Sequence, residues 1–159
     1  MANNPHMIAY RRAGRTDLST MTELLCELYE GHSHDELLAE NEAHFDDGKQ
    51  AFFIAYDGDK SVGVCHGARR SEYVNGKAYD GPVGYLEAIY VSPAYRLCGI
   101  ASALVALCET WVRENGCNEF LSDCLLDNTD SYKFHIRVGF AETERCIFFR
   151  KELAGCSTE

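Results

Sequence analysis

The segment VGYLEAIYVSPAYRLCGIASALV, residues 83–105, constrains the fold more than any other part of the chain. Its first part, 83–91, is rich in β-branched and aromatic residues and is apolar on both faces, which predicts a central strand. From Gly99 to about Asn115 the apolar residues recur at helical spacing, which predicts a helix that stops before Gly116. A strand that passes directly into a helix is typical of α/β sheets, so we expect an α/β fold.

The turn between this strand and this helix has the chemistry of an anion site. The first N–H groups of a helix have no intrahelical partner, and the helix dipole favours negative charge beside them. Gly99 carries no Cβ and lets the backbone approach a ligand, while Arg96 offers a guanidinium with bidentate geometry for phosphate oxygens. The pattern indicates a phosphate or pyrophosphate cradle. An ordinary strand-to-helix turn is the alternative that a single glycine leaves open.

The rest of the chain adds strands and helices on both sides of this unit. The expected order is strand, two helices, three strands, helix, strand, helix and strand, which gives a mixed central sheet of about six to seven strands flanked by about four helices. Residues 7–153 are predicted to form one domain, with 1–6 as an N-terminal extension and 154–159 as a tail. The other expected elements are strands at 7–13, 51–56, 61–70, 118–127 and 142–153, helices at 16–30, 33–48 and 128–139, and a loop or small hairpin at 71–82.

Composition limits the classes of partner. The chain has 159 residues, a hydrophobic fraction of 46% and a net charge of −10, which together predict a packed domain that binds neither nucleic acid nor an anionic membrane. A cationic ligand fits this charge, and so does a plain acidic surface. No apolar run approaches the roughly 20 residues of a membrane span, and the N-terminus lacks the apolar core of a signal peptide.

The cysteines argue for a reducing compartment. There are eight, and none forms a C-x-x-C pair, so no metal site is expected. Several lie on apolar stripes, where cysteine behaves as a small hydrophobic residue. We therefore expect reduced thiols and a cytoplasmic protein, with a disulfide framework as the less favoured alternative.

Two carboxylates stand out because they interrupt apolar strands. Glu87 lies within YLEAIYV and Asp123 within FLSDCLL. Burying an unpaired carboxylate costs several kcal/mol, so each needs a partner or faces a cleft that binds a cation. For these two residues a role in a binding site is the better interpretation. Glu144 is a third acid on a predicted strand, and taken alone it fits a rim or ion-paired position better.

The spacing V-x-P-x-x-R-x-x-G-I-A-x-x-L over residues 91–104 resembles motif A of the GNAT superfamily of acyl-CoA-dependent N-acetyltransferases. N-x-x-S…G-F over 128–140 is similar to its motif B. Leu97 and Cys98 stand where the family often has basic residues. The resemblance implies a GNAT fold and acetyl-CoA as co-substrate. The residues it implies are Arg96, Gly99, Ile100 and Ala101 for the pyrophosphate, Ile89, Tyr90 and Val91 for the thioester and pantetheine, and Asn128 on the pantetheine side.

A narrower resemblance concerns the acceptor. EYVNG at 72–76, PVGYLEAIYV at 82–91, SDCLLDN at 122–128 and GFAETE at 139–144 resemble one branch of the aminoglycoside 6′-N-acetyltransferases, whose activity confers antibiotic resistance. An aromatic residue stands at 29, on the predicted first helix, where that branch has tryptophan. Acids and aromatic rings suit a polycationic aminosugar. The acceptor-binding residues implied are Tyr29, Tyr73, Glu87, Asp123 and Glu144.

The implied reaction is attack of an amine on a thioester. An ammonium has no lone pair, so the amine must lose a proton, and Glu87 is the candidate acceptor, directly or through water. His135 is the candidate acid for the thiolate, and a helix-packing role explains it equally well. The resemblance also implies a homodimer. Two alternatives stay open: acetylation of another amine, such as a polyamine or a protein N-terminus, and a non-catalytic domain that senses acyl-CoA.

Overall fold

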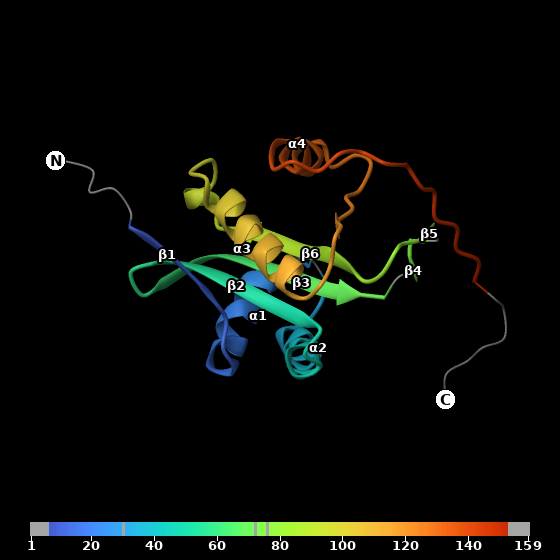
Figure 1. Ribbon diagram of the computed structural model, residues 1–159. Helices are drawn as coiled ribbons and strands as arrows, with labels where there is room; N and C mark the ends of the chain where they lie inside the picture. The colour runs from blue at the N-terminus through green and yellow to red at the C-terminus, as the bar shows by residue number, and fades with distance from the viewer. Residues whose placement is uncertain (1–6, 30, 72, 76, 153–159) are drawn as a thin grey trace, which may run out of the picture. The chain divides into compact units, whose positions relative to one another are not determined.

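The computed structural model describes residues 7–29, 31–71, 73–75 and 77–152 (Figure 1). The predicted extension at 1–6, residue 153 and the tail at 154–159 lie outside the described residues. The chain divides into two compact units, Met1–Asp123 and Cys124–Glu159. No helix among the described residues has the length and apolar character needed to cross a membrane.

The first unit is built on a mixed five-stranded sheet in the order β1-β2-β3-β6-β7. The first four strands pair antiparallel and β6 pairs with β7 in parallel. A separate two-stranded sheet, β4-β5, forms the small hairpin predicted at 71–82, with Asn75 in its turn at φ 53°. The strands are β1 Ile8–Arg12, β2 Gln50–Asp57, β3 Lys60–Arg70, β4 Tyr73–Val74, β5 Lys77–Ala78, β6 Val83–Val91 and β7 Phe120–Leu121.

Helix α3, Ile100–Glu114, covers one face of this sheet, in front of the strands in Figure 1. Its apolar stripe is buried, as the helical spacing predicts, and Gly116 ends it at φ 77°. Two glycines let the helix lie close to the strands. An ideal Cβ on Gly67 would be 2.2 Å from Cys108 Sγ, and one on Gly84 would be 2.3 Å from Val112 Cγ1. Larger residues at these positions would push the helix away from the sheet.

Helices α1, Leu18–Cys26, and α2, His34–Asp46, belong to the opposite face. Met21 and Leu25 of α1 pack with Phe52 and Val64 of the strands in a buried cluster. The capping box predicted at the start of α2 is present, since the Ser33 hydroxyl accepts from the Glu36 N–H. Two short 3-10 helices, η1 Arg15–Asp17 and η2 Pro93–Tyr95, complete the unit.

Three expectations need correction. The first helix ends at Cys26, so Tyr29 lies in the turn that follows, where its N–H still donates to the Leu25 carbonyl at 3.0 Å. The strand predicted over 118–127 is only Phe120–Leu121. It ends where the Ser122 hydroxyl donates to the Leu86 carbonyl, 3.2 Å away. A side chain thus takes the place that the next backbone donor of a longer ladder would have had.

The third correction concerns the C-terminal segment. The second unit contains α4, Thr129–Arg137, and Gly139 follows at φ 102°, as predicted. No described residue of 141–152 is in a strand. Phe148 and Phe149 are each 92% exposed, so the apolar pattern that predicted a strand has nothing to pack on within this unit. A strand forms only beside another strand that pairs with its backbone N–H and C=O groups. The apolar pattern within one segment does not show whether such a neighbour is present.

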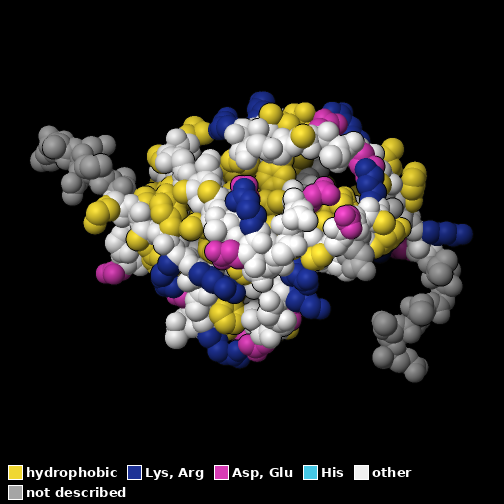
Figure 2. Space-filling view, in the orientation of Figure 1, with side chains coloured by type: hydrophobic (Ala, Val, Ile, Leu, Met, Phe, Trp, Pro, Cys, Tyr) yellow, Lys and Arg dark blue, Asp and Glu magenta, His cyan; other side chains and the backbone are white. Residues whose placement is uncertain are grey.

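The α/β fold is therefore confirmed, and the described residues form four α-helices and a central sheet of five strands instead of about six to seven. Acidic and basic side chains are interspersed over the face that Figure 2 shows. The net charge of −10 is not gathered into one acidic patch on that face.

Candidate active site

Glu87 reaches its position through an irregularity in β6. The ladder between β3 and β6 pairs His66 with Ala88 and Gly67 with Leu86, so Glu87 is an extra residue between two regular pairs. Such a bulge breaks the alternation of side chains along a strand. Glu87 and Ala88 thereby point to the same face of the sheet, Ala88 into the core beside α1 and Glu87 into a pocket.

The pocket has a volume of about 360 Å³ and lies on the face of the sheet that carries α1 and α2. Tyr29 and Glu87, two of the predicted acceptor residues, both line it. Its remaining lining combines apolar, amide, imidazole and carboxylate groups. The full set is Leu25, Tyr29, His32, Leu37, Glu40, Asn41, His44, Gln50, His66 and Glu87. The pocket mixes polar and apolar surface and contains two carboxylates, which suits a ligand that carries amino and hydroxyl groups.

Glu87 is paired, and its partner is a residue that the sequence analysis did not select. Arg70, the last residue of β3, donates from Nε to Glu87 Oε1 at 2.9 Å and from Nη2 to Glu87 Oε2 at 2.7 Å. The guanidinium carbon lies 3.5 Å from the centre of the Tyr85 ring. The Tyr85 hydroxyl in turn donates to Asp123. One chain of contacts therefore connects the two carboxylates that interrupt apolar strands.

Protonation in this region follows from burial and from these neighbours. Burial, followed by the bond to Asp123, raises the pKa of Tyr85 to about 12, so the hydroxyl keeps its proton at neutral pH. Burial, followed by the nearby His44, lowers the pKa of His66 to about 3, so the His66 ring in the pocket is neutral. Burial and then the charge of Glu87 raise the pKa of Tyr29. Each of these groups can accept or donate hydrogen bonds without carrying a charge.

The other predicted acceptor residues do not line the pocket. Tyr73 is on β4 with its side chain 65% exposed. Asp123 is also exposed, and contacts through Tyr85 and Arg70 connect it to the pocket's Glu87. Glu144 belongs to the second unit and is exposed there. The sequence positions of Arg70 and Tyr85 did not indicate that they connect Glu87 with Asp123, because an arginine at a strand end and a tyrosine in a strand are both common.

The predicted coenzyme region lies along the part of β6 beyond the end of β7, where β6 is still paired with β3. The parallel pairing of β6 with β7 consists of Gly84 with Phe120 and Tyr85 with Leu121, so within the described residues the later part of β6 has no strand beside it on that edge. This later part contains Ile89, Tyr90 and Val91. A sheet that opens in this way offers backbone groups to an extended ligand.

The turn after β6 has the geometry expected of an anion cradle. Gly99 is the N-cap of α3 at φ 81°, and an ideal Cβ there would meet nothing within 4 Å. The N–H groups of Ile100 and Ala101 begin a helix of 15 residues, long enough for its dipole to matter. Arg96 donates from Nε to the Val91 carbonyl at 2.9 Å, which directs its exposed side chain along the same turn. Leu97 is 95% exposed at φ 62°.

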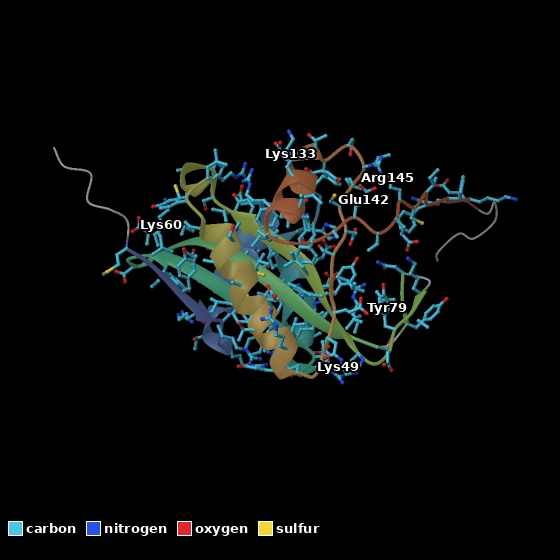
Figure 3. The ribbon with its side chains drawn as sticks, turned by 45° about the horizontal axis from the view of Figure 1, so that its top comes forward. Lys49, Lys60, Tyr79, Lys133, Glu142 and Arg145 are labelled. Atoms are coloured by element: carbon cyan, nitrogen blue, oxygen red, sulfur yellow. The ribbon has the colours of Figure 1, made fainter. Side chains whose placement is uncertain are left out.

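The second unit holds the two remaining predicted residues. Asn128 is the N-cap of α4, where its side chain accepts from the Ser131 N–H at 3.1 Å. His135 Nδ1 lies 2.7 Å from the Ser131 carbonyl oxygen, and its ring meets Phe140 edge-on at 5.3 Å. These contacts orient the imidazole within α4. Figure 3 shows Glu142 and Arg145 side by side after α4, where Arg145 Nε lies 2.6 Å from Glu142 Oε1.

Comparison with known proteins decides the family. Residues 18–140 match the model of the acetyltransferase (GNAT) family. The chain belongs to this family. A Salmonella typhimurium protein named aminoglycoside N(6′)-acetyltransferase type 1 is 39% identical over 141 residues, which is 89% of this chain and 97% of that protein. A protein of the same name from Acinetobacter baumannii is 37% identical over 139 residues, covering 87% and 94%.

Solved structures agree with these relatives. The complex of AAC(6′)-Iy with the bisubstrate analogue CoA-S-monomethyl-acetylneamine matches with a TM-score of 0.84 at 37% identity, over 92% of this chain and 99% of that one. AAC(6′)-Ih from Acinetobacter baumannii matches with a TM-score of 0.82 at 35% identity, over 92% and 99%.

Within the part of the chain that the structure describes, no three His, Cys, Asp or Glu side chains gather in a metal-binding arrangement.

Proposed function

We propose that this GNAT protein transfers an acetyl group from acetyl-CoA to the 6′-amine of aminoglycoside antibiotics, and thereby confers resistance to them. The observation that carries the proposal is the placement of Glu87, a carboxylate turned by a bulge in β6 into a pocket beside Tyr29. The names of the relatives and the bisubstrate complex of AAC(6′)-Iy support the same substrate pair.

The proposed chemistry uses few groups. The acceptor nitrogen forms a bond to the thioester carbonyl carbon, the carbon–sulfur bond breaks, and the sulfur leaves with the electron pair. Glu87, directly or through a water, takes the proton that the amine loses. The carbonyl oxygen becomes negative on the way, and a backbone N–H near Ile89 or Tyr90 stabilises it. His135 is the proposed donor of a proton to the departing thiolate.

Acetyl-CoA is the proposed co-substrate, with its pyrophosphate at the start of α3. Gly99, Ile100 and Ala101 supply backbone N–H groups there and Arg96 supplies positive charge. The later part of β6, from Ile89 to Val91, is proposed to lie along the pantetheine, with Asn128 on the same arm. The space in front of Gly99 fits this role, since a Cβ would meet nothing within 4 Å.

The double variant Arg96→Ala, Gly99→Asp tests this cradle. We expect the KM for acetyl-CoA to rise by a factor of at least about 30, because a guanidinium contact is lost and a carboxylate is placed against the phosphates. Gly99 has φ 81°, so part of the effect is strain in the backbone that forms the cradle. Steady-state kinetics at saturating acceptor measure the change. An unaltered KM for acetyl-CoA would refute the proposed cradle.

The position of acetylation is the test of the acceptor assignment. Tyr29, Tyr73 and the acids Glu87, Asp123 and Glu144 are proposed to bind the sugar rings and the ammonium groups that do not react. Kanamycin-type and tobramycin-type compounds with a 6′-amine are expected to be acetylated there. Analogues with a 6′-hydroxyl are expected to gain no acetyl group at that position, even where they bind. Mass spectrometry and NMR of the products decide, and acetylation of another ring nitrogen would contradict the 6′ assignment while leaving acetyl transfer intact.

The assembly and compartment are also proposals. Residues 7–153 are proposed to act as one acetyltransferase domain, since the family match spans both compact units. Ile147 is 77% exposed and lies beside the two exposed phenylalanines of the C-terminal segment, a surface that a second copy of the chain in a homodimer would cover. The cysteines that the structure describes are all free thiols, which supports a cytoplasmic location.

A further inference from the structure

Arg70 is held against the candidate base more firmly than an ordinary surface ion pair. Both oxygens of Glu87 accept from it, at 2.9 and 2.7 Å, and the guanidinium carbon lies over the Tyr85 ring, 3.5 Å from the ring centre. The Arg70 side chain is 35% exposed and that of Glu87 is 23% exposed, so water screens the pair only in part. The two hydrogen bonds to the carboxylate fix the direction of the guanidinium group, and the Tyr85 ring packs against it.

The ion pair with Arg70 leaves Glu87 with free acceptor positions for a further hydrogen bond. A carboxylate has two oxygens and about four acceptor positions, of which Arg70 occupies two. Glu87 also lines the pocket. It can therefore accept a hydrogen bond from an amine in the pocket while it stays bound to Arg70.

The charge of Arg70 changes which form of an amine the pocket prefers. An ammonium next to Glu87 is attracted by the carboxylate and repelled by the guanidinium beside it, so most of the gain in affinity is offset. A neutral amine can donate the same hydrogen bond without that repulsion. Only the neutral amine has the lone pair that attacks a thioester. Arg70 therefore weakens the binding of a cation and favours the form that reacts.

We propose that Arg70 is a positioning and specificity residue that orients Glu87 and neutralises its charge, so that the acceptor amine reacts more readily at the cost of tight binding. This inference rests on the proposed function. It differs from a purely structural role in one consequence: removal of Arg70 should strengthen acceptor binding and slow the reaction at the same time. A structural anchor predicts that both become worse.

The test compares Arg70→Met with the wild type at pH 7. We expect the Kd for tobramycin in the presence of CoA, measured by calorimetry, to fall about fivefold, because an opposing charge has gone. We expect the rate of acetyl transfer in a single turnover, which excludes product release, to fall about tenfold or more. Arg70→Lys keeps the charge but loses the fork, so its Kd should stay within about twofold of wild type while its rate falls less. If Arg70→Met does not fold, Arg70→Lys decides the question, because a loss of affinity together with the loss of rate in this variant would indicate a structural anchor and overturn the proposal.

Arg69→Met is the matched control. Arg69 is the preceding residue of the same strand, its Nε donates to the Asn115 carbonyl at 3.1 Å, and its removal changes the net charge equally without touching Glu87. Its Kd and rate should stay within about twofold of wild type. In a Glu87→Gln background, the loss of rate from Arg70→Met should disappear.

Three results would overturn the proposal: an unchanged or weaker affinity in Arg70→Met, an undiminished single-turnover rate, or the same loss of rate with Glu87 already replaced. Wild-type turnover is read first and tests the proposed function by itself. If the wild type acetylates no 6′-amine, the proposed function fails. The comparison of the tobramycin Kd between the wild type and the Arg70 variants needs no turnover, so it still tests whether Arg70 weakens the binding of a cation.

Discussion

Replacement of Glu87 with glutamine is expected to lower kcat/KM for tobramycin by about 10²- to 10⁴-fold, while the Kd for CoA stays unchanged. Glutamine has nearly the same shape but cannot take the proton of the amine. It also carries no charge to offset Arg70, so the guanidinium in the pocket then repels the cationic acceptor. Part of the loss, about 1.5–3 kcal/mol, should therefore be visible in the Kd for the aminoglycoside. Steady-state kinetics and calorimetry separate the two contributions.

The matched control is Glu109→Gln on α3. Glu109 pairs with Arg113 one helical turn away, so the same chemical change breaks an ion pair on the surface of the first unit. Its effect on kcat/KM should be less than about twofold, because an exposed pair contributes little. Wild-type acceptor kinetics in Glu87→Gln would mean that Glu87 is not part of the acceptor site.

Gly84→Ala is expected to destabilise the protein by about 3 kcal/mol and to lower Tm by about 10 °C. The new Cβ would lie 2.3 and 2.6 Å from the two methyl carbons of Val112 and 3.0 Å from Phe120 Cδ2. Val112 is 2% exposed on α3, so other atoms surround its side chain on nearly all sides. Gly84 also pairs with Phe120 across β6 and β7, so the clash strains the place where the sheet opens. Thermal and denaturant unfolding measure the change.

A second substitution shows whether the clash is the cause. Val112→Ala makes room for the new methyl group, so the double variant should be about 2 kcal/mol more stable than the sum of the two single changes predicts. Additive losses would contradict the packing explanation. Gly14→Ala serves as control, because Gly14 has a negative φ and its Cβ would have no heavy atom closer than 3.7 Å. That variant should change stability by less than about 1 kcal/mol.

Local chemistry explains which parts of this molecule were predictable. The strand at 83–91, the turn at Gly99 and the helix to Glu114 follow from residues that are neighbours in the sequence, and their boundaries in the structure lie within a residue of those expected. The capping box at Ser33 and the turn at Asn75 are likewise decided by side chains within a few positions. Periodicity and capping act over one or two helical turns, so a single sequence contains them fully.

Packing between distant segments decided the rest. The sequence by itself indicated that Glu87 needs a partner, but Arg70 is 17 positions away and becomes that partner only when β3 and β6 pair. The bulge that turns Glu87 into the pocket is a property of two strands in register, and no pattern in one of them predicts it. The exposed segment at 147–149 shows the converse, because a strand-like pattern forms a strand only where another backbone receives its hydrogen bonds. Composition and residue spacing thus determined most of the helices and strands and the class of reaction. Tertiary contacts determined which charged side chains meet, since residues far apart in the sequence come together only when the strands pair.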